Sequence, residues 1–390
     1  MAAVITGTGV VSPLAVGTAA FVKAVRDGRS AIKPLAQPSD IAVGARFDGP
    51  FDPGIDKKQK FLMDSVSQYA VAAAKEAMAM AGLAAVPANR IGAIIGIGVG
   101  AIETLDSAYQ ELYAGPGRVS PFTIPRSMPS APASSISMTL GVRGPAFCTA
   151  SACASSAHAI ITGALWLEAG LADAVIVGGS ETPFAPGLLR GWNAMRVMAD
   201  DTCRPFSIQR RGMVLGEGAA MLVLERLDDA RARGATILGV LRGYSANADA
   251  GHIVQPAGDS VAQAMLQALE SAGVSAADVG HVNGHATGTE LNDAVEAAAI
   301  ASVFGARPLV SGTKGATGHA LGAAAALEAI ICVHALLGQW IPPTLNSLGP
   351  DPACAQITIS PGAAVDSRYR VAVSSSFAFG GLNAVLVFGA

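Results

Sequence analysis

The amino-acid sequence predicts an α/β layered fold made of two duplicated βαβ halves. Strand-like apolar segments alternate with helical ones, and the alternation restarts after the charged segment 226–234. Each half also contains one unusually small-residue helix that follows a strand. The 390 residues exceed what one hydrophobic core usually serves. We therefore expect two halves of shared architecture, residues 1–235 and 236–390.

The first half contains four clear strand segments, "AAVITGTGVV", "IGAIIGIGVG", "DAVIVGGSE" and "GAAMLVLE", and a helix near 64–82. The second half repeats the alternation. It has strands at "TILGVLRGYS", "HVNGHATGT", "PLVSGTK", "RVAVSSSFAFGG" and "AVLVF", with helices at 260–272, 292–304 and 319–337. We expect the two small-residue helices to be buried centrally.

The longest uncharged stretch, Gly144 to Leu167, is long enough to cross a membrane. It is rich in Ala, Ser and Cys rather than in Leu, Ile and Phe, which disfavours a membrane span. We expect instead a strand ending near Phe147, a turn through Thr149–Ala152 and a helix over Cys153–Glu168. Small side chains let other backbones approach that helix closely.

The overall composition indicates a globular protein with a large core. Apolar residues make up 51% of the chain and charged residues 14%, and 45 residues are glycine. A net charge of -3 without a run of Lys and Arg disfavours nucleic acid as a partner. The N-terminus lacks the pattern of a signal peptide, so we expect a cytoplasmic protein. Five cysteines without a CxxC pair are expected to be free thiols.

Cys153 is a candidate nucleophile. It lies at the expected first turn of the buried helix, where free N–H groups and the positive end of the helix dipole favour a thiolate. The alternative is an inert buried cysteine, which is the commonest state of a free Cys. Its position alone leaves both readings open.

His285 and His319 are the candidate hydrogen-bond or proton donors. Each follows an expected strand, in a glycine-rich turn before a helix, and α/β proteins bind ligands at such strand ends. A zinc site is the rival, but no carboxylate or third His lies at ligand spacing, so we expect no metal. The other histidines, which we expect to pack or to face solvent, are His158, His252, His281 and His334.

Two further constellations accompany the histidines. Lys314 and Glu328 flank His319 in surroundings too apolar to leave a charge unpaired, so we expect them to pair or to bond to the site. In "SSSFAFGGLNA", Gly380 permits a backbone shape that exposes an N–H toward a ligand, and Phe379 could cover a pocket. The alternatives are ordinary helix-end charges and a hairpin with core aromatics.

Taken together, these motifs resemble the β-ketoacyl-acyl-carrier-protein synthases of the thiolase superfamily over nearly the whole chain. "TASACASSAHA" is similar to the nucleophile motif, and "HATGT" and "GATGHALGAAAALEAI" are similar to the two histidine motifs. "RPFSIQRRGMVLGEGAAMLVLE" and "FAFGGLNA" resemble two further signatures. The resemblance implies a thiolase-like fold of five layers, α-β-α-β-α.

The resemblance also implies roles for these residues. Cys153 would accept an acyl group from acyl carrier protein, with the backbone N–H groups of Cys153 and Phe379 as the oxyanion hole. His285 and His319 would bind the thioester oxygen of malonyl-carrier protein, which loses carbon dioxide and attacks the acyl group. No metal or redox cofactor is implied. The remaining family positions are Lys314 and Glu328 in the catalytic set, Phe377 and Gly380 at the gate, Thr287 and Thr289 at the substrate, and Val99 and Leu189 in a roomy acyl pocket.

The sequence departs from the family in three places. Ser207 to Arg211 replaces an acidic Asp-x-x-Arg-Asp stretch, and Ala378 replaces the Gly between the two phenylalanines. Phe61 and Leu62 stand where relatives often carry basic residues for carrier docking. Docking is therefore expected to use other basic residues, namely Lys57, Lys58 and Arg118.

Two alternative functions remain beside the elongating synthase. A thiolase acting on coenzyme A thioesters would need a second catalytic Cys, where this chain has Phe379. A non-catalytic partner subunit, such as a chain-length factor, would lack the nucleophile Cys153. Fatty acid, polyketide and polyene pathways all stay open, and so do a homodimer and a heterodimer with a chain-length-factor-like subunit. A dimer is expected because so apolar a chain would otherwise expose a large apolar face.

Overall fold

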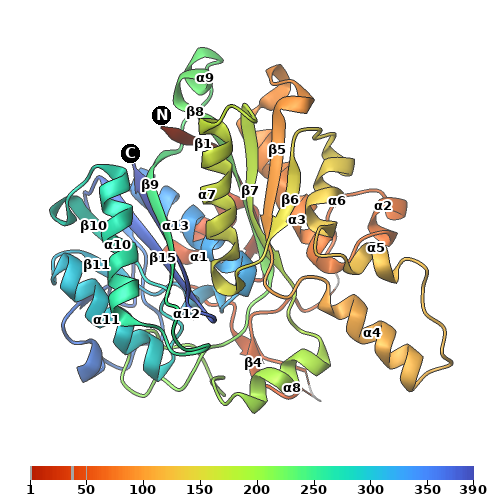
Figure 1. The fold of residues 1–390 in the computed structure, drawn as a ribbon. Helices are drawn as coiled ribbons and strands as arrows, with labels where there is room; N and C mark the ends of the chain where they lie inside the picture. Colours follow the sequence, from red (N-terminus) through yellow and green to blue (C-terminus); the bar gives the residue numbers. More distant parts are fainter. Residues whose placement is uncertain (1, 37–38, 50) are drawn as a thin grey trace.

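Two five-stranded sheets with the same strand order, joined edge to edge into one continuous sheet that β13 (Thr358–Ile359) extends beyond β11 (Leu309–Ser311), form the frame of the molecule (Figure 1). The computed structural model describes residues 2–36, 39–49 and 51–390. The first sheet contains, in spatial order, β1 (Ala3–Ser12), β8 (Gly218–Arg226), β7 (Ala174–Glu181), β5 (Ile91–Gly96) and β6 (Ala146–Thr149). The second contains β9 (Gly239–Ala248), β16 (Leu382–Gly389), β15 (Val371–Ala378), β10 (Val279–Asn283) and β11 (Leu309–Ser311).

The strand directions repeat as well as the order. The five strands of each sheet can be numbered by their order in the chain. The fifth strand pairs antiparallel with the first and with the fourth. The second strand pairs parallel with the fourth and with the third. A short antiparallel pairing of β1 with β9 joins the sheets edge to edge. The faint internal similarity of the sequence therefore does reflect a duplicated topology.

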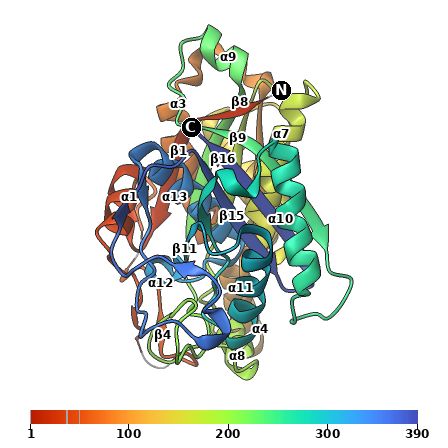
Figure 2. The ribbon, with the colours of Figure 1, turned by 90° about the vertical axis from the view of Figure 1, so that its left-hand side faces the viewer.

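Helices cover the sheets in the five layers that the family resemblance implies. On the outer side of the first sheet lie α3 (Ser65–Ala81) and α6 (Ala131–Leu140), and on the outer side of the second lie α10 (Gly258–Ala272) and α11 (Glu290–Phe304). Between the sheets, α7 (Ser155–Glu168) packs against α13 (Ala324–Gly338) (Figure 2). The layer order is thus α-β-α-β-α.

The remaining elements decorate this frame. Short strands are β2 (Ala15–Val16), β3 (Lys33–Pro34), β4 (Val43–Gly44), β12 (Trp340–Ile341), β13 (Thr358–Ile359) and β14 (Val365–Asp366). Peripheral helices are α1 (Thr18–Arg26), α2 (Lys57–Phe61), α4 (Ile102–Tyr113), α5 (Thr123–Ser127), α8 (Pro186–Ala194), α9 (Leu227–Ala232) and α12 (Lys314–Thr317). The 3-10 turns are η1 (Leu83–Ala85), η2 (Ala88–Arg90), η3 (Ala152–Ala154), η4 (Ala276–Asp278), η5 (Leu321–Ala323) and η6 (Pro352–Cys354).

The central helices form from residues that suit burial on every side. In α13, twelve of the 15 residues are buried, and each of Leu327, Ile330 and Ile331 contributes roughly 1.5–3 kcal/mol by leaving water. One segment, Leu321–Gly338, is long and apolar enough to cross a membrane, but 83% of it is buried inside the protein. It is a core helix of this fold. The Gly144–Leu167 run likewise forms a strand, a turn and a helix, as expected.

The expected elements form, but several strands are shorter than expected: β5 ends at Gly96, β10 at Asn283 and β11 at Ser311, where glycine-containing turns begin. Two helices also begin later than expected. The helix expected from Cys153 begins at Ser155, because Ala152–Ala154 forms a 3-10 turn first. The second small-residue helix, expected from about residue 319, likewise begins after a 3-10 turn, at Ala324. Both central helices are therefore preceded by a 3-10 turn, and these turns lie near the carboxyl ends of the parallel strands.

Glycine residues near these turns allow main chains to come into direct contact. A Cβ added to Gly96 in β5 would lie 2.3 Å from the backbone nitrogen of Ser156 in α7, and one added to Gly322 would lie 2.3 Å from the backbone nitrogen of Gly98. Both contacts involve backbone atoms, which cannot swing away as a flexible side chain could. The strand ends and helix starts that surround Cys153 are thus held by main-chain contact.

Replacing Gly96 by Ala should therefore destabilise the fold by about 1–3 kcal/mol, the usual range for overpacking a core. Urea denaturation followed by circular dichroism measures the change. Gly191→Ala is the matched control, because an added Cβ there meets nothing within 4 Å and Gly191 lies within a helix, so stability should stay the same or rise slightly. Equal stability of wild type and Gly96→Ala would contradict the close approach.

Candidate active site

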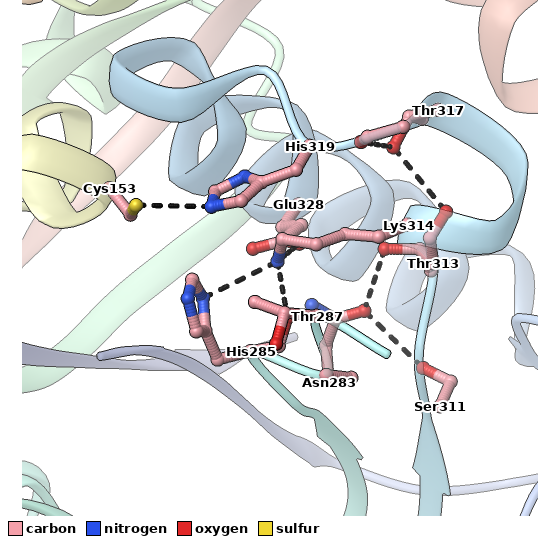
Figure 3. A network of polar contacts seen from close by, with 12 residues as sticks. Cys153, Asn283, His285, Thr287, Ser311, Thr313, Lys314, Thr317, His319 and Glu328 are labelled. Carbon is pink, nitrogen blue, oxygen red and sulfur yellow. Dashed lines mark hydrogen bonds and ion pairs between the residues drawn. The ribbon is translucent and has the colours of Figure 1, made fainter. Parts of the chain in front are cut away.

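The loops that follow the parallel strands of both sheets converge on one place (Figure 3). Cys153 follows β6, His285 follows β10, Lys314 and His319 follow β11, and Phe379 follows β15. Carboxyl ends of parallel strands are where α/β folds place ligands. The structure therefore brings together the five residues that lie apart in the sequence.

Cys153 sits in the sharp 3-10 turn between β6 and α7. The turn begins with Ala152 at φ 50°, an uncommon left-handed conformation for a non-glycine residue. Ser155 holds it, because its hydroxyl accepts the N–H of Ser151 and donates to the carbonyl of Ile97. Cys153 itself is 7% exposed.

The expectation that a helix N-terminus makes Cys153 a thiolate is wrong. The residue precedes α7 rather than occupying its first turn. Burial raises the pKa of its thiol to about 12, and the nearby Lys314 ammonium offsets this only in part. Desolvation outweighs the helix dipole, whose effect is modest and confined to the terminal turn. The resting form is therefore the thiol, which needs a base.

His319 is placed to be that base. Its Nε2 lies 3.0 Å from Sγ of Cys153. Its main chain is fixed by a 2.7 Å hydrogen bond from its own N–H to the carbonyl of Val214. Burial and the charge of Lys314 hold the pKa of His319 well below its ordinary value, so the ring is neutral and can accept a proton. Among the described residues its Nδ1 has no partner, so neither tautomer is locked.

His285, in contrast, is locked in one tautomer. The ammonium of Lys314 lies 3.4 Å from its Nδ1 and also bonds the carbonyl of His285. Because an ammonium only donates, Nδ1 must accept, and the proton resides on Nε2. Burial, then Lys314 and His319, keep the pKa of His285 well below its usual value. His285 is therefore a neutral donor through Nε2–H.

Lys314 and Glu328 form the buried ion pair that the sequence suggested. Their side chains are 1% and 2% exposed. Burial raises the pKa of Glu328 to about 7, while Lys314 lowers it. The carboxylate thus holds the ammonium against His285, where a lone buried charge would be strongly unfavourable.

The turn after β15 supplies a main-chain donor and a cover. The backbone N–H groups of Phe379 and of Cys153 itself hydrogen-bond toward the Cys153 sulfur and act to lower its pKa. The ring of Phe379 packs against Trp192 with 6.1 Å between ring centroids. The prediction that the N–H of Gly380 faces a ligand is wrong, because this N–H donates to the carbonyl of Ile253 at 2.7 Å. The available donor is Phe379.

A pocket of about 150 Å³ opens onto Cys153, His285 and His319. Phe377, Phe379, Thr287 and Thr289 line it, as do residues that sequence reasoning missed, namely Trp192, Val197, Met213, Leu291, Asn292 and the segment 252–256. His252 thus faces the pocket mouth rather than solvent alone. No sequence signal marked Trp192, because it lies in a peripheral helix remote from every motif.

Neither Val99 nor Leu189 is among the described residues that line this pocket. Leu189 borders a separate cavity beside Phe184 and Glu217. The N–H of Val99 donates to the buried carboxylate of Glu181, whose pKa burial raises to about 7. Their role in the acyl pocket stays a prediction.

Two buried carboxylates that the sequence reasoning missed fix the loops of the site. Glu181 accepts N–H groups from Gly98 and Gly100 in one half and from Gly322 in the other. Glu296 accepts the N–H of His285 and that of Ala286. A lone Glu at the end of the apolar strand "DAVIVGGSE" was the signal that could have identified the first.

The thiol and the two imidazoles also form a possible metal set. One ligand atom of each of Cys153, His285 and His319 lies within 4.8 Å of the others. The donor types suit zinc. The geometry fits poorly, because the Lys314 cation already bonds Nδ1 of His285 and the cysteine is a buried thiol. The absence of a metal therefore remains our expectation.

The comparisons with known proteins agree with this geometry. Residues 2–230 match the family model "Beta-ketoacyl synthase, N-terminal domain" and residues 238–347 match "Beta-ketoacyl synthase, C-terminal domain". The chain is 44% identical to nodulation protein E of Rhizobium sp. (strain N33) over 99% of this chain and 98% of that protein. It is 42% identical to 3-oxoacyl-[acyl-carrier-protein] synthase 2 of Staphylococcus aureus over 86% of each.

A solved structure described as the ishigamide ketosynthase/chain length factor superposes with a TM-score of 0.94 at 31% identity, over 100% of this chain and 98% of that one. Fold and family matches together define a thiolase-like enzyme of the acyltransferase type. More specifically, the chain belongs to the β-ketoacyl synthase family.

The protonation state of Cys153 predicts how alkylation depends on pH. Because burial raises the pKa of the thiol to about 12, the thiolate fraction should rise throughout the accessible range. The rate of iodoacetamide labelling of Cys153, followed by mass spectrometry, should rise about tenfold per pH unit from about pH 7 to about pH 9. Cys153→Ala identifies labelling of the other cysteines. A rate that is already constant below pH 7 would show a stable thiolate–imidazolium pair instead.

Proposed function

We propose that this protein is an elongating β-ketoacyl synthase in which Cys153 carries the growing acyl group. The observation that supports this most directly is the 3.0 Å contact between Sγ of Cys153 and Nε2 of a neutral, unlocked His319. A second, locked imidazole, His285, stands beside it with 5.3 Å between ring centroids. One ring can take a proton and both can donate to an oxygen.

In the first step, the thiol of Cys153 gives its proton to His319 and attacks the thioester of an acyl group carried on phosphopantetheine. The N–H groups of Cys153 and Phe379 stabilise the oxyanion that forms. The pantetheine thiolate leaves and takes the proton back from His319. The products are acyl-Cys153 and a free carrier thiol, so atoms and charge balance.

In the second step, malonyl-carrier protein binds with its thioester oxygen against Nε2–H of His285 and of His319. Both rings are neutral, so their N–H groups are weak acids that stabilise developing negative charge by donating hydrogen bonds and do not readily give their protons to the carbanion. Carbon dioxide leaves, and its bonding electrons form the enolate that attacks the acyl carbon. The Cys153 thiolate is expelled and is protonated from solvent. Decarboxylation drives the reaction, and no metal or redox cofactor enters these steps.

The thiolase alternative is less well supported. It would need a second cysteine at the reacting centre, but among the described residues that line the pocket only Cys153 is a cysteine. The buried cysteines at 203, 332 and 354 and the half-buried Cys148 are packing residues. A non-catalytic partner subunit would not need the Cys153–His319 contact.

Acyl carrier protein is the proposed partner, as the name of the Staphylococcus aureus relative indicates for that enzyme. Basic residues surround the expected docking region, with Lys57, Lys58 and Lys60 in α2 and Arg118 exposed nearby. Phe61 is 57% exposed, and the guanidinium of Arg126 lies 4.7 Å from its ring centroid. The docking surface thus combines positive charge with an apolar centre.

We also propose a dimer built on β6. This strand ends the first sheet, and Phe147 on it is 39% exposed beside the exposed Leu165 of α7 and Met138 of α6. An unpaired edge strand with apolar neighbours favours pairing with another chain. The second chain is either another copy or a chain-length-factor-like subunit, as in the ishigamide structure. The proposed chemistry is the same in fatty acid, polyketide and polyene synthesis.

The two steps should fail independently in variants of the site. Cys153→Ala should abolish acyl loading and condensation, while malonyl-carrier protein still loses carbon dioxide at His285 and His319. His285→Ala should still form acyl-Cys153, but decarboxylation should fall by about 100-fold or more, the scale for losing one oxyanion-type donor. His319→Ala should behave in the same way, with slower loading because the base is gone. Mass spectrometry and carbon dioxide release measure the two steps.

Wild-type decarboxylation rates in both histidine variants would overturn these roles. If the Cys153→Ala variant still binds an acyl group covalently at another residue, the assignment of Cys153 as the nucleophile is wrong. If the wild-type protein neither loads an acyl group nor decarboxylates malonyl-carrier protein, the proposed function itself is wrong.

The proposed dimer predicts a change of size on one substitution. Phe147→Glu places a charge on the edge strand, so it should convert the dimer to monomer at micromolar concentration, as measured by sedimentation velocity. Leu337→Glu alters an exposed apolar residue at the end of α13 and serves as the control. A wild-type protein that sediments as a monomer would contradict the proposal.

A further inference from the structure

The turn that carries His285, Thr287 and Thr289 is held by side chains that lie outside it, in addition to the hydrogen bond between its two threonine hydroxyls. At its start, Glu296 accepts the N–H groups of His285 and Ala286. In its middle, Asp293 accepts the N–H of Gly288, at 3.1 Å. Its far end presents the carbonyls of Thr289, the N-cap of α11, and of Glu290, its first residue. The Thr289 carbonyl accepts the N–H of Asp293 at 3.3 Å, and each carbonyl oxygen has a second lone pair that can accept another donor.

Arg210 supplies those donors. Its Nε donates to the carbonyl of Thr289 at 3.0 Å, and its Nη2 donates to the carbonyl of Glu290 at 2.8 Å. Its Nη1 forms a 2.5 Å ion pair with Asp351. Arg210 is 5% exposed, so the guanidinium is withdrawn from water and fully engaged.

This arrangement is hard to explain by helix stability alone. The positive charge lies at the N-terminus of α11, where the helix dipole disfavours a cation. Asp351 balances the positive charge of Arg210. Charge balance alone would not require the two hydrogen bonds from Arg210 to the carbonyls of Thr289 and Glu290. The planar fork of Arg instead fixes two successive carbonyl groups in a defined geometry.

The residues in contact with the fork identify what is being positioned. The hydroxyls of Thr287 and Thr289 lie 2.9 Å apart and both residues line the pocket that leads to Cys153. His285, at the other end of the turn, is held separately by Glu296 and Lys314. A disturbance at Arg210 should therefore reach the threonines more than the histidine.

The sequence around Arg210 departs from the family pattern, yet the fork is kept. Ser207 replaces an expected acid, and its hydroxyl accepts the N–H of Leu348 and donates to the carbonyl of Gly349. Arg211 replaces the other acid and points outward, 68% exposed, 3.9 Å from Asp200. The loop is thus tied to the 348–351 segment through Ser207 and through Arg210 itself.

We infer that Arg210 is a positioning residue that orients Thr287 and Thr289 to bind the pantetheine arm of carrier-bound substrates. The inference rests on the proposed function, because it assigns the arm to this wall of the same pocket. Arg210 touches neither the thiol nor the imidazoles, so it should govern substrate binding and not the reactivity of Cys153.

The test compares two reagents that alkylate the same thiol in the full-length protein. Iodoacetamide reports the reactivity of Cys153 alone, whereas a chloroacetyl amide of pantetheine must first bind through the arm. In Arg210→Lys, which keeps the charge but loses the fork, half-saturation by the pantetheine reagent should rise about tenfold or more. The iodoacetamide rate should stay within about twofold of wild type. Partial unfolding would expose the buried thiol and raise its iodoacetamide rate, so an unchanged iodoacetamide rate also shows that the site is intact in the variant.

Arg211→Lys is the matched control and should change neither rate. Asp351→Asn keeps the carbonyl contacts of Arg210, so it should raise half-saturation less than Arg210→Lys does. In the condensation assay, Arg210→Lys should raise KM for malonyl-carrier protein more than it lowers kcat.

Three outcomes would overturn the inference. The concentration of pantetheine reagent at half-saturation could be unchanged in Arg210→Lys, or labelling by both reagents could weaken equally in that variant. The third outcome is that labelling of the wild type by the pantetheine reagent does not saturate. If the wild type labels saturably and Arg210→Lys weakens that saturation, while the wild type fails to condense, the positioning role stands and the proposed function falls.

Discussion

The buried ammonium of Lys314 is the interaction on which the site depends. It is held by Glu328 and donates toward Nδ1 and the carbonyl of His285, so it determines the tautomer of that ring. Burial lowers the pKa of both His285 and His319, and the charge of Lys314 lowers them further and opposes the effect of burial on Cys153. One cation, placed where water cannot screen it, thereby reinforces the unprotonated state of two imidazoles beside a thiol.

That cation can be kept in place because the two halves meet through their main chains. Glycine lets the backbone of Gly96 approach that of Ser156, and lets the backbone of Gly322 in the second half approach that of Gly98 in the first. Glu181 joins the halves there by accepting N–H groups from each. Catalysis of the proposed kind needs donors that do not reorganise as charge develops, and main-chain N–H groups held in this way meet that condition.

The duplicated topology also gives the halves different tasks. The turn after β6 presents Cys153, the proposed nucleophile, while the corresponding turn after β11 presents Lys314 and His319. The turn after β15 supplies the Phe379 N–H and its ring, which reaches Trp192 of the first half. The site is therefore assembled across the boundary between the halves, so that neither half contains the full set of groups.

The sequence by itself determined the α/β fold class and the duplication, because strand periodicity shows where strands and helices alternate. The positions of Cys153, His285, Lys314, His319 and Phe379 made them candidates, and the resemblance of their motifs to the β-ketoacyl synthases implied that they share one site. Only the tertiary structure decided the charge state of Cys153, since burial depends on what packs over it and outweighs a dipole inferred from position. The bonded state of the Gly380 N–H and the contact of Trp192 with the gate were equally beyond local pattern. Their partners lie more than 100 residues away, and no periodicity records which distant loop closes over a site.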